Sequence, residues 1–135
     1  MTDRDAVREF LRERGCPEDV VAGGLEGLVA EWERTVRQVE VGYALGLDDY
    51  LNDLDGRQLA DEAMTHANEG ARETARQRLL DADRRMKAAT RTVGECLWGR
   101  TVGDAEGWTA EKNWWYFSLP RSPGPALAAD LEGGE

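Results

Sequence analysis

The chain has 135 residues, of which 41% are apolar and 33% are charged. This length and composition are typical of one globular domain that buries a core without disulfide bonds. The 27 acidic and 17 basic residues give a net charge of -10, which disfavours non-specific binding to nucleic acid or anionic lipid. No stretch approaches the roughly 18 apolar residues of a membrane helix or the apolar core of a signal peptide, so we expect a cytoplasmic protein.

Apolar residues at helical spacing predict two helices in the first third of the chain. The first covers 3–14 and ends at Gly15, where a glycine can take the left-handed conformation that terminates helices. The second covers 18–41, and the three glycines in its first turns indicate close backbone packing. Its apolar stripe recurs every three or four residues, at Val21, Leu25, Leu28, Trp32, Val36 and Val39.

The middle of the chain predicts a connection and two further helices. Residues 42–56 would form the connection, with a short helix capped by Asp48. A third helix would begin after Gly56 and fade at 68–70. A fourth helix would run from 71 to Gly99, because small and apolar residues recur along it at Ala71, Ala75, Leu79, Ala82, Met86, Ala89, Val93 and Cys96 or Leu97.

The helical pattern ends after Gly99. We expect a loop and then a hairpin, in which Trp108-Thr109 pairs with Trp114 to Leu119 across a short turn. The fold class is therefore all-α, an antiparallel bundle of about four helices with a short C-terminal extended segment or β-hairpin rich in aromatics. Residues 1–120 would form a single helical domain and 121–135 a flexible acidic C-terminal tail.

The aromatic segment near the C-terminus is the most informative feature for function. In a strand, Trp114 and Tyr116 would point to one side and Trp115 and Phe117 to the other, so both sides would be apolar. One side can pack on the helices, whereas the other needs a second surface, a second copy or another protein. The alternative is that all four rings seal the end of the bundle. The residues predicted to form an interface are Trp108, Trp114, Trp115, Tyr116 and Phe117.

Charge is unevenly distributed along the chain. From Arg72 to Arg91 there are seven bases and three acids, a net charge of +4 that leaves -14 for the remainder. From Glu40 to Glu69 there are eight acids and one base, Arg57. We expect these two stretches to neutralise each other as neighbouring helices. A nucleic-acid-binding stripe on the basic stretch is disfavoured, because it would lie in a strongly negative field.

Two arrangements of acidic residues suggest metal sites, and both are incomplete. Asp53, Asp55 and Glu62 fall at calcium-ligand positions of a loop starting at Leu51, but Leu51 itself supplies no oxygen ligand. His66 has Glu62 and Glu69 at helical spacing, yet zinc sites and metal-binding helical bundles draw several such ligands from different helices. An exposed histidine paired locally with a carboxylate is the better interpretation.

Catalytic motifs are missing from the sequence. Cys16 and Cys96 lack the CxxC spacing of redox or zinc sites, so we expect two reduced structural thiols. There is no phosphate loop, nucleotide-binding glycine motif or nucleophile elbow. We therefore predict no catalytic residues, no cofactor and no bound metal.

These observations favour a non-catalytic cytoplasmic protein-interaction domain. It would bind a basic protein partner, or a second copy of itself, through the aromatic segment and the neighbouring acidic face. The alternative is a small-molecule or metal-binding helical bundle, and potentially an enzyme. Its pocket would lie near Trp32, Tyr50 and His66, with Tyr43, Trp98, Asp49 and Asp53 around it. Neither a nucleic acid nor a membrane is expected as a partner.

Overall fold

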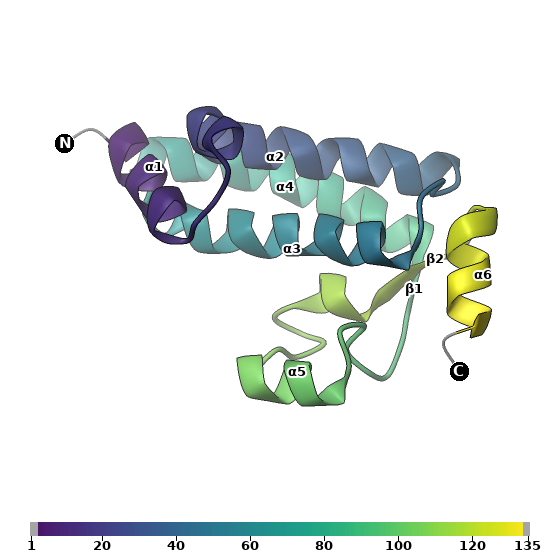
Figure 1. Cartoon of the computed structure of the whole chain (residues 1–135). Helices are drawn as coiled ribbons and strands as arrows, with labels where there is room; N and C mark the ends of the chain where they lie inside the picture. The colour runs from purple at the N-terminus through teal and green to yellow at the C-terminus, as the bar shows by residue number, and fades with distance from the viewer. Residues whose placement is uncertain (1–2, 134–135) are drawn as a thin grey trace.

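The computed structural model describes residues 3–133. Within this range the chain is mostly helical and carries one small antiparallel sheet of two strands (Figure 1), as the sequence led us to expect for a helical fold. The helices pack against one another, α2 contacting α1, α3 and α4. The elements are α1 (Asp3–Glu13), α2 (Glu18–Val41), α3 (Leu47–Met64), α4 (Glu69–Ala89), β1 (Thr90–Thr92), α5 (Arg100–Glu106), the 3-10 turn η1 (Trp114–Phe117), β2 (Ser118–Pro120) and α6 (Pro125–Gly133).

The first two helices agree with the sequence prediction at both ends. Gly15 follows α1 with a φ of 76°, and Gly42 follows α2 with a φ of 106°. Within α2, the predicted close packing at the glycines is wrong. A Cβ at Gly23, Gly24 or Gly27 would meet no atom within 4 Å beyond its chain neighbours and the backbone of its own helix. The glycines instead allow a break in the helix, since Gly24 has a φ of 60° and a ψ of -156°.

α3 differs from the prediction because it is continuous. The short helix and the third helix expected on either side of Gly56 form one helix, Leu47–Met64, with Gly56 inside it. A glycine in a helix interior costs roughly 1 kcal/mol. Burial on both sides of it outweighs that cost, because Leu51 and Leu54 before it and Ala60 and Ala63 after it are all buried.

α4 ends ten residues earlier than expected. It stops at Ala89 instead of near Gly99, and the next three residues form β1. Thr90, Thr92 and Val93 are β-branched, which lowers helix propensity and suits a strand. The region expected to be a loop after Gly99 contains α5.

The predicted hairpin is also wrong. Trp114–Phe117 is a 3-10 turn rather than a strand, and the strand that follows it, β2, pairs with β1. The register places Thr90 opposite Pro120 and Thr92 opposite Ser118. A backbone hydrogen bond from Val93 N–H to Phe117 O continues this pairing beyond the strands. We refer to residues 90–120, from β1 through α5 and η1 to β2, as the aromatic lobe; it lies below α3 in Figure 1.

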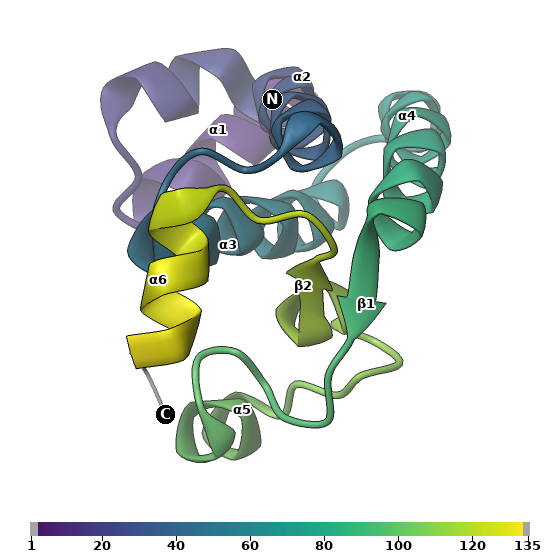
Figure 2. The same cartoon turned by 90° about the vertical axis from the view of Figure 1, so that its right-hand side faces the viewer.

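The structure continues beyond the prolines that were expected to end it. The segment 121–135 was predicted to be a flexible acidic tail, and Pro125–Gly133 of it forms α6 beside the first turn of α3 (Figure 2). Leu127 is fully buried. The carboxylate of Asp130 accepts a hydrogen bond from Leu47 N–H at 2.9 Å, and so satisfies a donor that the start of α3 leaves open.

The core consists of two clusters of buried side chains. The smaller one joins α1, the start of α2 and the end of α3 through Val7, Leu11, Val21, Ala60 and Ala63. The larger one lies among α2, α3, α4 and the aromatic lobe, and Leu25 packs against both. Its largest members are Trp32, Tyr43, Tyr50, Trp115 and Tyr116. The aromatic lobe is therefore packed into the main core.

Candidate functional site

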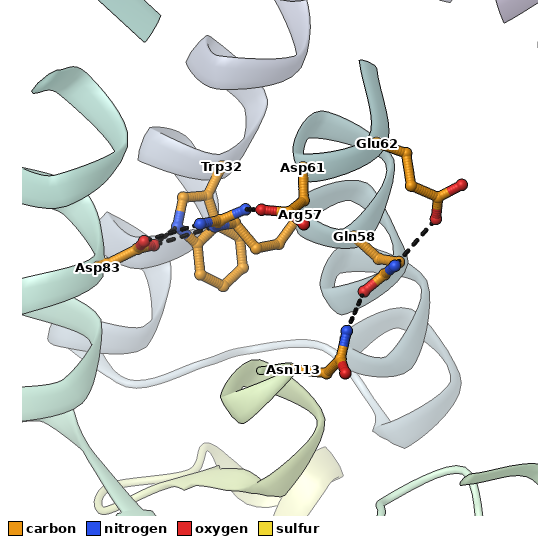
Figure 3. Close-up of polar contacts among 7 residues, drawn as sticks. All are labelled: Trp32, Arg57, Gln58, Asp61, Glu62, Asp83 and Asn113. Atoms are coloured by element: carbon orange, nitrogen blue, oxygen red, sulfur yellow. Dashed lines mark hydrogen bonds and ion pairs between the residues drawn. The ribbon is translucent and has the colours of Figure 1, made fainter. Parts of the chain in front are cut away.

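A buried ion pair lies where α2, α3 and α4 meet the aromatic lobe (Figure 3). Arg57 of α3 donates to Asp83 of α4 from Nε at 3.1 Å and from Nη2 at 2.9 Å. Trp32 of α2 donates to the same carboxylate from Nε1 at 2.8 Å. The Arg57 guanidinium also lies 4.4 Å from the centre of the Trp115 ring, so one charged group ties three helices to the lobe.

The carboxylate of this ion pair has no free oxygen, whereas Arg57 Nη1 makes no hydrogen bond among the described residues. Both oxygens of the Asp83 carboxylate accept hydrogen bonds, and Arg57 and Asp83 are 5% and 8% exposed. Asp61 lies 3.5 Å from the remaining Arg57 nitrogen, Nη1. Burying such a pair is costly unless other contacts compensate for the lost water. Here the hydrogen bonds to Asp83 and the nearby Asp61 provide this compensation. The role of the pair is to fix how the helices and the lobe fit together.

A second polar chain links the lobe to α3, also shown in Figure 3. The Asn113 amide donates to Gln58 Oε1 at 2.9 Å, and Gln58 donates in turn to Glu62 at 2.9 Å. Glu62 also pairs with Arg14 beyond the end of α1. This chain orients the turn that precedes η1.

The structure separates the predicted interface residues into two groups. Trp115, Tyr116 and Phe117 are buried, at 2%, 1% and 8% exposure. Trp108 and Trp114 are half-buried. The expectation of two opposed apolar sides fails because a 3-10 turn, unlike a strand, does not alternate its side chains between two faces. Three of the rings therefore complete the core, and only the two tryptophans keep partly accessible surface.

The half-buried Trp108 is held in place by a stack that begins at α3. Its ring stacks on Tyr116 with centroids 4.0 Å apart and planes inclined by 17°. The Tyr116 hydroxyl donates to Asp55 at 2.6 Å, and Trp98 Nε1 donates to the same oxygen at 3.0 Å. Burial and the hydrogen bond to Asp55 raise the pKa of Tyr116 well above its ordinary value. Tyr116 is therefore a neutral donor at physiological pH.

Two hollows flank Ala110 on the surface of the lobe. The first, which we call the Trp108 hollow, has a volume of about 380 Å³ and is lined by Trp108, Glu95, Cys96, Arg100, Asp104 and Phe117 among others. The second, the Trp114 hollow, has a volume of about 430 Å³ and is lined by Trp114, Lys87, Thr90, Thr92, Glu111 and Ser118 among others. Each half-buried tryptophan of the predicted interface thus forms a wall of one hollow.

The predicted neutralisation between the basic stretch 72–91 and the acidic stretch 40–69 is found at Arg85–Glu40, but the basic residues of α4 do not neutralise the first half of α3. Arg78 and Arg85 pair with Glu33 and Glu40 of α2, and other α4 bases pair within α4 itself. Hydrogen bonds from these arginines lower the pKa values of Glu33 and Glu40. Among the described residues, no salt bridge involves the four carboxylates of the first half of α3, which we call the acidic face: Asp48, Asp49, Asp53 and Asp55.

The other candidate sites from the sequence do not come together. The proposed calcium loop at 51–62 lies inside α3, and no group of three or more metal-ligating side chains occurs within residues 3–133. His66 lies in the turn after α3 and stacks on Phe10 at 4.4 Å, and no salt bridge joins it to a carboxylate among the described residues. Cys16 is half-buried, and burial raises the pKa of the Cys96 thiol.

Among the described residues, the side chains expected around the alternative ligand pocket are either inside the core or far apart. Trp32, Tyr43 and Tyr50 are at most 1% exposed, inside the main core. His66 follows the far end of α3, and at 1.5 Å rise per residue it lies about 24 Å along the helix axis from Tyr50. These side chains therefore cannot line one cavity. Trp98, the remaining aromatic of that set, lies on the aromatic lobe.

Comparisons with protein-family models, curated proteins and solved structures give no significant match. Among the described helices, none combines the length and the apolar character needed to cross a membrane. The sequence could not have revealed the Trp98–Asp55–Tyr116–Trp108 arrangement, because its members are spread over 61 residues of chain. The one available signal was the density of tryptophan after residue 97.

Proposed function

We propose that this chain is a non-catalytic protein-binding domain whose partner is a basic protein. The observation that carries the proposal is that the acidic face, which no salt bridge neutralises among the described residues, adjoins the exposed aromatic surface of the lobe at Asp55, the hydrogen-bond acceptor of Trp98 and Tyr116. Trp98 is 36% exposed and Val102 39% exposed. Tryptophan is over-represented among residues that dominate binding energy, and an acidic surface accelerates the encounter with a basic partner.

Charge favours a basic partner over a second copy of the chain. Two copies would each carry -10, and this repulsion opposes their association. Residues 93–117 contain four acids and two bases, so the lobe surface has the same sign as the acidic face. Val41, Leu45 and Leu80 are exposed as well, but they line neither hollow of the lobe.

The cytoplasm is the setting that we propose for this binding. Both cysteines are free thiols, which suits a reducing compartment. Catalysis is not part of the proposal; the buried carboxylate of Asp83 is already held by three hydrogen bonds from Trp32 and Arg57.

The test is calorimetric titration with a synthetic peptide of alternating arginine and glycine, beside the same peptide with glutamate in place of arginine. The Asp48→Asn, Asp49→Asn double variant should bind the basic peptide about fivefold more weakly, because exposed charge pairs are each worth up to about 1 kcal/mol. The matched control is Glu9→Gln, Glu13→Gln on α1, at the opposite end of the molecule (Figure 1). Equal weakening by both double variants would show that only net charge matters and would refute the proposed face.

A further inference from the structure

The Trp108 hollow combines an aromatic wall with carboxylates at its rim. Its volume of about 380 Å³ falls within the range of roughly 300 to 1,000 Å³ that is usual for ligand sites. Cys96 and Phe117, which are both buried, also line it. Trp108 forms one wall, and the charged residues that line the hollow are Glu95, Arg100 and Asp104. These groups are suited to a side chain that is both cationic and planar.

We propose that the Trp108 hollow receives one arginine side chain of the basic partner. This inference rests on the proposed function, and it specifies which chemistry of the partner is recognised. A guanidinium can stack on an indole and at the same time donate hydrogen bonds to carboxylates, which a lysine ammonium does less well.

The indole is already positioned for such a contact. Trp108 stacks on Tyr116, and Tyr116 is fixed by its hydrogen bond to Asp55. Little side-chain freedom therefore remains to be lost when a ligand binds, and that loss is one of the main costs of association.

The carboxylates are available to an incoming cation. Among the described residues, no salt bridge involves Asp104. Glu95 is bound to Arg100 at 2.6 Å, and these two side chains are 62% and 75% exposed. Such exposed pairs are weak and exchange readily. The Arg100 guanidinium on Glu95 also shows that the rim can hold this chemical group.

The cations that already lie over the neighbouring tryptophans explain why we place the partner's arginine at Trp108. Lys87 Nζ lies 4.7 Å from the Trp114 ring, and the Arg57 guanidinium lies 4.4 Å from the Trp115 ring. Trp108 has no such cation from the described part of its own chain. The first two indoles are thus already occupied by cations, and the third faces a hollow with an unpaired carboxylate.

The test compares arginine–glycine and lysine–glycine peptides by calorimetric titration of the full chain. We expect the wild type to prefer arginine by about threefold to tenfold, in line with stacking on an accessible indole. Asp104→Asn should weaken binding of the arginine peptide about fivefold. Arg100→Gln should strengthen it about threefold, because it frees Glu95 and removes a like charge. Glu9→Gln, an exposed carboxylate on α1, serves as the control and should change nothing.

Trp108→Leu should abolish the preference for arginine over lysine while leaving the charge unchanged. If Trp108→Leu fails to fold, the Asp104→Asn and Arg100→Gln variants still test the proposal. Binding that is unaffected by Asp104→Asn and Arg100→Gln, but weakened by the Asp48→Asn, Asp49→Asn double variant, would overturn the arginine site and leave the proposed function standing. Failure of the wild type to bind either basic peptide would overturn both.

Discussion

The helical part, α1–α4, and the aromatic lobe are held together by different forces. In α1–α4 the contacts are long apolar stripes, with one buried ion pair at their meeting point. The lobe has only short elements, and it is attached through polar groups of α3 and through three buried rings of η1. The short elements of the lobe bury three rings but leave Trp98, Trp108 and Trp114 partly accessible. The binding surface that we propose therefore lies on the lobe.

Asp83→Asn should destabilise the helical part most. Arg57 would lose its charged partner while it remains buried, and breaking a buried pair in this way costs about 4 kcal/mol. Chemical denaturation followed by circular dichroism measures the free energy of unfolding. Asp81→Asn, which removes the exposed partner of Arg84 on the same helix, is the control and should cost less than about 1 kcal/mol. A small effect of Asp83→Asn would mean that the ion pair does not organise the core.

Trp115→Ala should lower the free energy of unfolding by about 3 kcal/mol, because it removes a large ring that is 2% exposed. The half-buried Trp108 offers the comparison within the lobe, and Trp108→Ala should cost clearly less. The same denaturation experiment measures both. Equal costs would indicate that Trp115 is not part of the core.

Gly103→Ala should destabilise the lobe by about 2 kcal/mol through overpacking. A Cβ at Gly103 would lie 2.8 Å from Cys96 Cβ, so α5 would have to move away from Cys96. Gly94→Ala is the matched control, since no atom lies within 4 Å of a Cβ at that position. If both variants have the same stability as the wild type, α5 does not pack as described.

Acid should weaken the contacts between α2 and α4 by a small amount. The lowered pKa values of Glu33 and Glu40 mean that their contribution is fully present above about pH 4.5 and is lost as the pH falls through the folded-state values. The Glu33–Arg78 pair is half-buried and the Glu40–Arg85 pair is more exposed, so the stability lost with each pair should be small. Asp53 acts in the opposite direction, because burial raises its pKa. The pH dependence of unfolding should become flatter in the Glu33→Gln, Glu40→Gln variant; an unchanged slope would argue against both ion pairs.

The sequence predicted the helical part better than the lobe for a physical reason. A stripe such as Val21 to Val39 repeats over many turns, and the end of its helix is marked by a glycine. Gly56 misled the prediction because its local penalty is smaller than the gain from burying its neighbours, which depends on tertiary contacts. The partners of Arg78 and Arg85 on α4 were likewise set by which helix packs beside these arginines, and that helix is α2.

The lobe depends almost wholly on contacts between distant residues. β2 pairs with β1 from the end of α4, across 28 residues, and neither strand is long enough to show an alternating pattern. The four consecutive aromatics suggested a strand, but η1 allows three of them to enter the core together. From the candidate site, the sequence predicted Trp108 and Trp114 as interface residues, but only together with Trp115, Tyr116 and Phe117, which are buried. It could not identify Asp55, Asp104 or Trp98 as their neighbours.

The most direct test of the proposed binding surface is a nuclear magnetic resonance titration of the indole N–H signals with the arginine–glycine peptide. The chain has five tryptophans, and each gives a separate reporter. We predict that the signals of Trp98 and Trp108 shift most, while those of the buried Trp32 and Trp115 stay in place. Shifts confined to Trp114, or none at any indole while the peptide binds, would contradict a docking surface at the junction of the acidic face and the aromatic lobe.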